Sequence, residues 1–184
     1  MKKGFTLIEL LIVIAILAVL GTIAVLVINP AQMLAQARDS QRLSDMAAVR
    51  KALALYASTA STVTITASTT CTNTPTGNVH SGIAATINSS TLVTGSGWVN
   101  IDITTSLGGS PLGSLPTDPT NDATYEYCYA GDLSNKTFEL NARLESTKYK
   151  AKMTVDNGND NTCTTYTEDT CYYEVGTDPG LDLF

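Results

Sequence analysis

The chain has 184 residues, of which 43% are hydrophobic, and a formal net charge of −6 at pH 7. An acidic chain has little electrostatic attraction for nucleic-acid phosphates, so direct DNA or RNA binding is not expected. The single histidine, His80, lies in an uncharged loop, and there is no phosphate-binding glycine loop or metalloprotease motif. The sequence therefore predicts a protein that is not an enzyme.

An apolar run from Phe5 to Ile28 follows two lysines and a glycine. As a helix it would span about 36 Å, enough to cross a hydrocarbon core of about 30 Å. It is longer than the apolar core of a cleaved secretory signal, so it predicts a transmembrane helix over residues 5–28. Lys2 and Lys3 indicate that the N-terminus stays in the cytoplasm and the rest of the chain lies outside.

Glu9 is the only ionisable side chain in this apolar run. An acid in a membrane-spanning helix costs on the order of 3 kcal/mol at the helix centre, and less near its end. One interpretation is a first-turn acid that the helix dipole favours. The other is a charge that needs a partner. Cleavage after Gly4 would make Phe5 the N-terminus, and this amine could neutralise Glu9 of a neighbouring subunit.

The stretch from Lys3 to Val13, KGFTLIELLIV, resembles the cleavage and methylation motif of type IV prepilins and type II secretion pseudopilins. The resemblance covers about the first thirty residues. It implies that prepilin peptidase removes residues 1–4 as a leader by cutting between Gly4 and Phe5, and then N-methylates Phe5. It also implies a homopolymer built by an inner-membrane assembly platform of a pilus or secretion system. The filament would be extracellular or periplasmic.

Gly21 and the Asn29-Pro30 pair are expected to bend or weaken the helix. Either Pro30 kinks one long helix, or Asn29 caps a new helix that starts with Pro30. Residues 29–58 are predicted to be its amphipathic second half. Its apolar stripe, expected to face the head, consists of Met46, Val49, Leu53 and Tyr56.

Four charged residues precede this stripe in the predicted helix. We interpret them as solvated charges that could also bridge subunits in a filament. They are Arg38, Asp39, Arg42 and Asp45.

The remaining residues, 59–184, are numerous enough for one small head domain with its own core. Residues 59–110 are a Ser/Thr-rich insertion, either a linker or a partly packed segment. Packing of the insertion would involve Cys71, Ile83, Ile87, Leu92 and Trp98.

Residues 111–150 contain two alternating runs that predict an antiparallel hairpin, 124–129 and 137–144. The core face of the second run would be Phe138, Leu140, Ala142 and Leu144. Residues 151–184 are expected to form an acidic loop region. The predicted fold is α+β, with a long N-terminal helix packed on a small antiparallel sheet, similar to pilins.

Four cysteines lie in the part of the chain predicted to be exported. An even number outside the membrane favours disulfides in an oxidising compartment. Of three pairings we favour Cys71–Cys128 and Cys163–Cys171. Zinc is not expected, because no C-x-x-C spacing is present.

An oxygen-rich turn in the tail contains Asp156, Asn157, Asn159 and Asp160. It lacks the acid spacing of a helix–loop–helix calcium site, so an ordinary turn is one interpretation. The segment Pro116-Thr117-Asp118-Pro119 and the Tyr-rich run at 124–129 are similar to major pseudopilins. This resemblance implies calcium in a loop after the main strands. Weaker candidate ligands are Asp118, Glu168 and Asp169. No other cofactor is expected.

These observations favour a structural subunit of a type IV pilus-like filament, assembled through its N-terminal helix. A major pseudopilin of a type II secretion system is the alternative, because both classes share the motif. A membrane-anchored binding domain is a third hypothesis.

Overall fold

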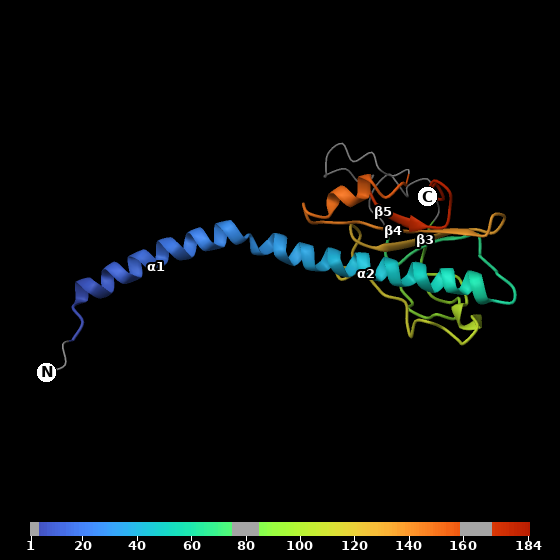
Figure 1. Cartoon of the computed structure of the whole chain (residues 1–184), viewed down its shortest axis with the longest axis horizontal. Coiled ribbons are helices and arrows are strands. Elements are labelled where there is room, and N and C mark those ends of the chain that lie inside the picture. The colour runs from blue at the N-terminus through green and yellow to red at the C-terminus, as the bar shows by residue number, and fades with distance from the viewer. Residues whose placement is uncertain (1–3, 75–84, 159–170) are drawn as a thin grey trace. The chain divides into compact units, whose positions relative to one another are not determined.

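The computed structural model describes residues 4–74, 85–158 and 171–184. The chain divides into two compact units, Met1–Ala35 and Gln36–Phe184. The first contains helix α1, and the second contains most of helix α2 and all of the β-sheet (Figure 1).

Helix α1 spans Leu7–Ile28 and passes through Gly21 without interruption. It ends at Asn29, whose backbone is left-handed (φ 44°) and whose N–H donates to Val25 O at 3.2 Å. Helix α2, Pro30–Thr59, begins at the next residue. The Asn29 side chain accepts the N–H of Gln32 at 3.3 Å, so one asparagine closes α1 and caps α2. Proline suits the first position of α2 because no helical partner is needed there for its missing N–H.

The sheet has five strands in the order β2-β1-β3-β4-β5. Strand β1 pairs parallel with β2, and the other neighbours pair antiparallel. The predicted α+β, pilin-like fold class is confirmed. The small sheet is mixed, because β1 and β2 pair parallel while the other pairs are antiparallel as predicted. Fourteen residues lie between the end of β1 at Cys71 and the start of β2 at Thr86, which is long enough for the connection that a parallel pair needs. The strand bounds are Thr69–Cys71, Thr86–Ile87, Tyr127–Asp132, Thr137–Ala142 and Tyr173–Gly176.

The predicted hairpin is confirmed as β3 and β4, with Tyr129 opposite Leu140. Its turn is ordered by Asp132, whose carboxylate accepts the backbone N–H groups of Ser134 and Asn135. This is the local bonding that favours aspartate before a turn. Strand β5 was not expected, because the acidic tail was predicted to be a loop. It pairs with β4, placing Val175 opposite Leu140.

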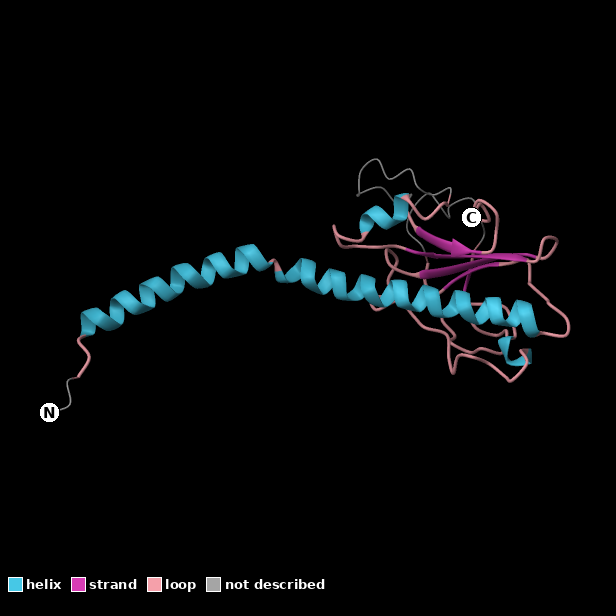
Figure 2. Ribbon diagram, viewed as in Figure 1, coloured by secondary structure: helices cyan, strands magenta, loops and turns pink. Residues whose placement is uncertain are grey.

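Helix α2 lies along one face of the sheet, and the predicted apolar stripe makes the contact (Figure 2). All four residues of the stripe are buried. The predicted hairpin residues Phe138, Leu140, Ala142 and Leu144 are buried too. Side chains of a strand alternate between faces, so Tyr127 and Tyr129 of β3 join this core.

The Ser/Thr-rich insertion packs into the same core rather than forming a linker. Trp98 is fully buried, and its Nε1 donates to Pro116 O at 2.9 Å. The insertion also buries Ile65, Val99, Ile101 and Ile103. Of the packing residues expected here, Cys71 and Trp98 are buried, Ile87 and Leu92 are exposed, and Ile83 lies outside the described residues.

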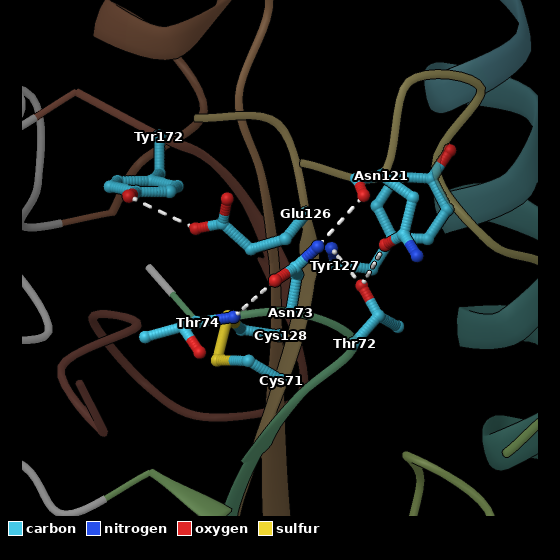
Figure 3. The surroundings of a disulfide bond; sticks show 9 residues. All are labelled: Cys71, Thr72, Asn73, Thr74, Asn121, Glu126, Tyr127, Cys128 and Tyr172. Atoms are coloured by element: carbon cyan, nitrogen blue, oxygen red, sulfur yellow. Dashed lines mark hydrogen bonds between the residues drawn. A yellow bond between two sulfur atoms is a disulfide. The ribbon is translucent and has the colours of Figure 1, made fainter. Parts of the chain in front are cut away.

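The predicted disulfide between Cys71 and Cys128 is confirmed and joins directly opposed residues of β1 and β3 (Figure 3). Its Cα atoms are 4.1 Å apart, and 57 residues separate the two cysteines. Closing a loop of this length contributes about 4 kcal/mol in the chain-entropy account. The bond ties the insertion to the hairpin.

The sheet face opposite α2 carries buried carboxyl groups. Glu126, Glu139 and Glu174 are all fully buried. Figure 3 shows Glu126 directed toward Tyr172, whose hydroxyl lies 3.5 Å from Glu126 Oε1. Burial raises the pKa of Glu126 to about 8, against a partly offsetting charge from Arg143. This side chain is therefore protonated at neutral pH.

Arg42 of α2 is a fully buried cation. Its Nε and Nη2 donate to both oxygens of Asp118, at 2.6 and 2.9 Å. Its Nη1 donates to Asp39 at 2.9 Å and to Glu145 at 3.0 Å. Burial alone would lower the pKa of Arg42, but the bonds and charge of Asp118, Glu145 and Asp39 hold it above the ordinary value.

Asp39 extends this ion cluster to the backbone. Its carboxylate accepts the N–H of Ser146 at 2.7 Å and that of Glu145 at 3.0 Å. Arg38 binds Glu145 through two nitrogens, which lowers the pKa of that carboxyl. The charges of α2 thus fasten the loops on either side of the β3–β4 hairpin to the helix.

The interpretation of these helix charges as solvated is therefore wrong for Asp39 and Arg42, which have no exposed side-chain surface. Asp45 also has a partner within the head, because it accepts the Tyr127 hydroxyl at 2.9 Å. Asp118, a weaker calcium candidate, is occupied by Arg42 instead.

We expect Arg42→Met to lower the free energy of unfolding by about 3–5 kcal/mol, because it leaves buried carboxylates without their cation. Arg38→Met should lower the free energy of unfolding much less, since Arg38 is partly exposed. Denaturant unfolding of the full chain in detergent, followed by the fluorescence of Trp98, measures both. Equal losses for the two variants would contradict a central role for Arg42.

We expect Glu126→Gln to change how stability depends on pH. Between pH 4.5 and about 8, Glu126 is ionised in the unfolded state and protonated in the folded state. The unfolded state binds fewer protons, so stability falls as pH rises through this window. In the variant, this decrease of stability with rising pH should disappear. Relative to the natural chain, its free energy of unfolding should rise by up to about 1.4 kcal/mol for each pH unit in this window.

The measurement is the free energy of unfolding at pH 5, 6.5 and 8 for both proteins. Asp182→Asn, which removes an exposed carboxylate, is the matched control. A difference between Glu126→Gln and the natural chain that stays constant across the three pH values would show that Glu126 ionises normally in the folded state.

Candidate functional site: the N-terminal processing and assembly segment

Gly4 and Phe5 precede α1 without contact to the rest of the fold. A Cβ on Gly4 would meet no atom within 4 Å, and Phe5 is 88% exposed. The fold therefore has no steric need for glycine at position 4. A glycine here leaves the backbone before α1 open to approach from outside the chain.

Thr6 and Glu9 form a reciprocal capping box at the start of α1. Glu9 Oε2 accepts the backbone N–H of Thr6 at 2.8 Å and the Thr6 hydroxyl at 2.7 Å. In return, Thr6 Oγ1 accepts the N–H of Glu9 at 3.4 Å. The two side chains satisfy donors that the first turn of a helix otherwise leaves open.

Thr6 is the residue that sequence reasoning missed. The spacing of a threonine three residues before a glutamate, ahead of an apolar run, is the recognised signature of this cap. The capping box is consistent with both interpretations of Glu9, as a first-turn acid and as a charge that needs a partner. The acid lies in the first turn, and its carboxylate reaches the residue that directly follows Phe5.

The surface of α1 beyond this cap is apolar on every side. Its large hydrophobic side chains from Leu7 to Val25 are exposed, because no other described part of the chain covers them. By length and composition this helix could cross a membrane. A helix with apolar residues all round is stable where lipid or other helices surround it.

The other predicted sites lie in the head. Cys171 is buried, but its predicted partner Cys163 lies outside the described residues. So do the candidate calcium ligands Asn159, Asp160, Glu168 and Asp169.

Two of the predicted calcium ligands can be placed. The Asp156 carboxylate accepts the N–H groups of Gly158 at 3.2 Å and Glu174 at 3.0 Å. Asn157 is exposed with φ 73°. Within the described part of the chain, no three His, Cys, Asp or Glu residues gather to hold a metal ion. Asp156 and Asn157 alone do not complete a calcium site.

Residues 1–25 match the family model of the prokaryotic N-terminal methylation motif. This motif is the type IV prepilin-like cleavage and methylation signal. A search of curated proteins and a search of solved structures found no match to this chain. The chain therefore carries a type IV prepilin-like N-terminus, at the segment where Gly4, Phe5 and the Thr6–Glu9 cap lie.

Proposed function

We propose that this prepilin-like chain is a structural subunit of a type IV pilus-like filament, assembled through α1 after prepilin peptidase cleavage. The observation that carries the proposal is the N-terminal methylation motif placed on a helix that is apolar all round and capped by Glu9. A simple anchor would need the apolar helix but neither the unconstrained glycine nor the acid at its start.

Cleavage would hydrolyse the peptide bond between Gly4 and Phe5 and leave a cationic amine on Phe5. N-methylation keeps that positive charge. In the filament, the amine of one subunit would approach Glu9 of a neighbour and neutralise its charge inside a bundle of apolar helices. Such an ion pair is strong in a low-dielectric interior and sets the axial register of the helices.

The cap suggests how Glu9 is tolerated before assembly. In the structure its carboxylate is held by Thr6, one residue beyond the cleavage position. The acid thus has local partners while the subunit waits in the inner membrane, with its N-terminus in the cytoplasm and its head outside. The head, held to α2 by the Arg42 cluster, would form the filament surface.

A major pseudopilin of a type II secretion system is the second candidate. The segment from Pro116 to Pro119, in which Asp118 binds Arg42, precedes a tyrosine-rich strand β3. This order is the feature that resembles pseudopilins. The partners of either assembly would be copies of this chain, prepilin peptidase and an inner-membrane assembly platform. A membrane-anchored binding domain remains a third, less favoured hypothesis.

We expect the mature chain to begin with N-methylated Phe5 in cells that contain an active prepilin peptidase. Mass spectrometry of its N-terminus tests this directly. A mature chain that still begins at Met1 would overturn the proposal of a processed filament subunit.

Variants of Glu9 separate the charge from the cap. Glu9→Leu should be inserted and cleaved but assemble at least about tenfold less filament, as counted by electron microscopy of sheared material. Glu9→Gln keeps a side chain that can form the capping box but removes the charge, so it should also assemble poorly. Normal filaments from Glu9→Gln would refute the pairing with the Phe5 amine.

For the pseudopilin alternative we propose that the turn at residues 156–160 binds calcium. Millimolar calcium should then raise the melting temperature of the full chain, because a ligand that binds only the folded state stabilises it. Asp156→Asn should abolish the rise, whereas Asp102→Asn should not. An unchanged melting temperature in the natural chain would count against both calcium binding and the pseudopilin assignment.

A further inference from the structure

A hollow in the head lies at the C-terminal end of α2. Its volume is about 490 Å³, within the range of about 300–1,000 Å³ that small-molecule sites occupy. Three segments form its walls: the end of α2 at Tyr56, residues 60–66, and residues 95–105 of the Ser/Thr-rich insertion. All three belong to the same compact unit of the chain.

Hydrogen bonds between the walls hold the hollow open. Tyr56 is buried, and its hydroxyl accepts the backbone N–H of Thr64 at 2.8 Å. The Thr66 hydroxyl donates to Asn100 O at 3.0 Å, which ties the second wall to the third. The Asn100 amide nitrogen donates in turn to the hydroxyl of Thr70, a buried residue of β1, at 3.1 Å. The hollow is therefore formed before a ligand arrives, so binding has little ordering cost.

Gly95 allows the third wall to close around Asp102. Its φ is 80°, in the left-handed region, and a Cβ there would lie 3.2 Å from Asp102 N. Asp102 uses one carboxylate oxygen within the wall, because Oδ1 accepts the N–H of Thr104 at 3.1 Å in the 3-10 helix η1, Ile103–Thr105. Its Oδ2 has no hydrogen bond to the described residues.

Several other polar groups of the walls also make no hydrogen bond within the described part of the chain. They are the hydroxyls of Ser61, Thr62 and Thr64 and the side-chain oxygen of Asn100. Each hydroxyl can both donate and accept, whereas the oxygens of Asn100 and Asp102 only accept. A ligand that displaces water from these groups must replace its hydrogen bonds, because an unsatisfied buried group costs about 1–3 kcal/mol.

The composition of the walls excludes other classes of ligand. Among the described residues that line the hollow there is no lysine, arginine or histidine to balance a phosphate, sulfate or carboxylate. Asp102 is the single acid among them, and the described residues hold no cluster of metal-ligating side chains. An apolar ligand would leave the hydroxyls without partners. A neutral ligand rich in hydroxyl groups fits, because each of its hydroxyls can donate and accept.

We propose that this hollow binds one uncharged sugar unit. The hydroxyls of the sugar pair with Thr62, Thr64, Asn100 and Asp102, and its C–H groups lie against Ala60. The site is built entirely by the folded head, so sugar binding requires neither α1 nor filament assembly.

The test uses the full chain in phosphatidylcholine nanodiscs, because many detergents carry sugar headgroups that would compete. Saturation-transfer NMR is recorded with millimolar methyl glycosides of glucose, galactose, mannose and N-acetylglucosamine, and with the corresponding free hexoses. We expect transfer to at least one neutral sugar and none to methyl glucuronide, whose carboxylate would meet Asp102 without a cation nearby. Transfer to methyl glycosides identifies the end of a glycan as the ligand, whereas transfer to free hexoses alone identifies a soluble sugar.

Two matched double variants at exposed threonines locate the site. Thr62→Val with Thr64→Val removes two hydroxyls of the hollow and should weaken binding about tenfold or more. Thr91→Val with Thr154→Val, outside the hollow, should leave the affinity unchanged.

Three results would overturn the proposal: no transfer to any neutral sugar, an unchanged affinity in the variant of Thr62 and Thr64, or stronger binding of methyl glucuronide than of the neutral glycosides. None of them bears on processing or filament assembly, which the N-terminal mass spectrum and the Glu9 variants test separately.

Discussion

The structure of the head depends on the ion pairs that the buried guanidinium of Arg42 makes with three carboxylates. A buried cation without partners would cost several kcal/mol, so its three carboxylates must be brought together for the fold to form. Asp39 lies one turn away on α2, but Asp118 and Glu145 come from loops on either side of the β3–β4 hairpin. Pairing with Arg42 therefore fixes where the chain contacts α2 just before the hairpin and just after it. The apolar stripe from Met46 to Tyr56 packs on the sheet to which this hairpin belongs.

Charged side chains are paired differently in the head and at the N-terminus. In the head, Arg42 is permanently paired within the chain, which suits a rigid unit. At the N-terminus, the bonds that the described residues make to the Glu9 carboxylate come from Thr6, which is exposed. In the proposed function, a subunit that leaves a bilayer to join a filament would exchange this contact for one with a neighbouring subunit.

Periodicity and turn chemistry were sufficient for the parts of the fold that are local in sequence. The helix and the hairpin with Phe138 and Leu140 inside are found in the structure. The Cys71–Cys128 bond is also found, but it joins cysteines 57 positions apart and was predicted from the even cysteine count rather than from periodicity. Strand β5 was missed because Tyr173–Gly176 is short and surrounded by acids, and it becomes a strand only through pairing with β4. The parallel β1–β2 pair was missed because a two-residue strand has no period to recognise.

The sequence alone determined the processing and assembly segment: its length, apolarity and the motif around Gly4, Phe5 and Glu9 are properties of consecutive residues. The Thr6–Glu9 cap was readable as well, because its partners are three residues apart. Only the tertiary structure decided the roles of the charged residues in the head. Asp118 lies 76 residues from Arg42 and Glu145 lies 103 residues from it, so no local pattern distinguishes these partners from solvated surface charges. Their function depends on burial, and burial is decided by the packing of helix against sheet.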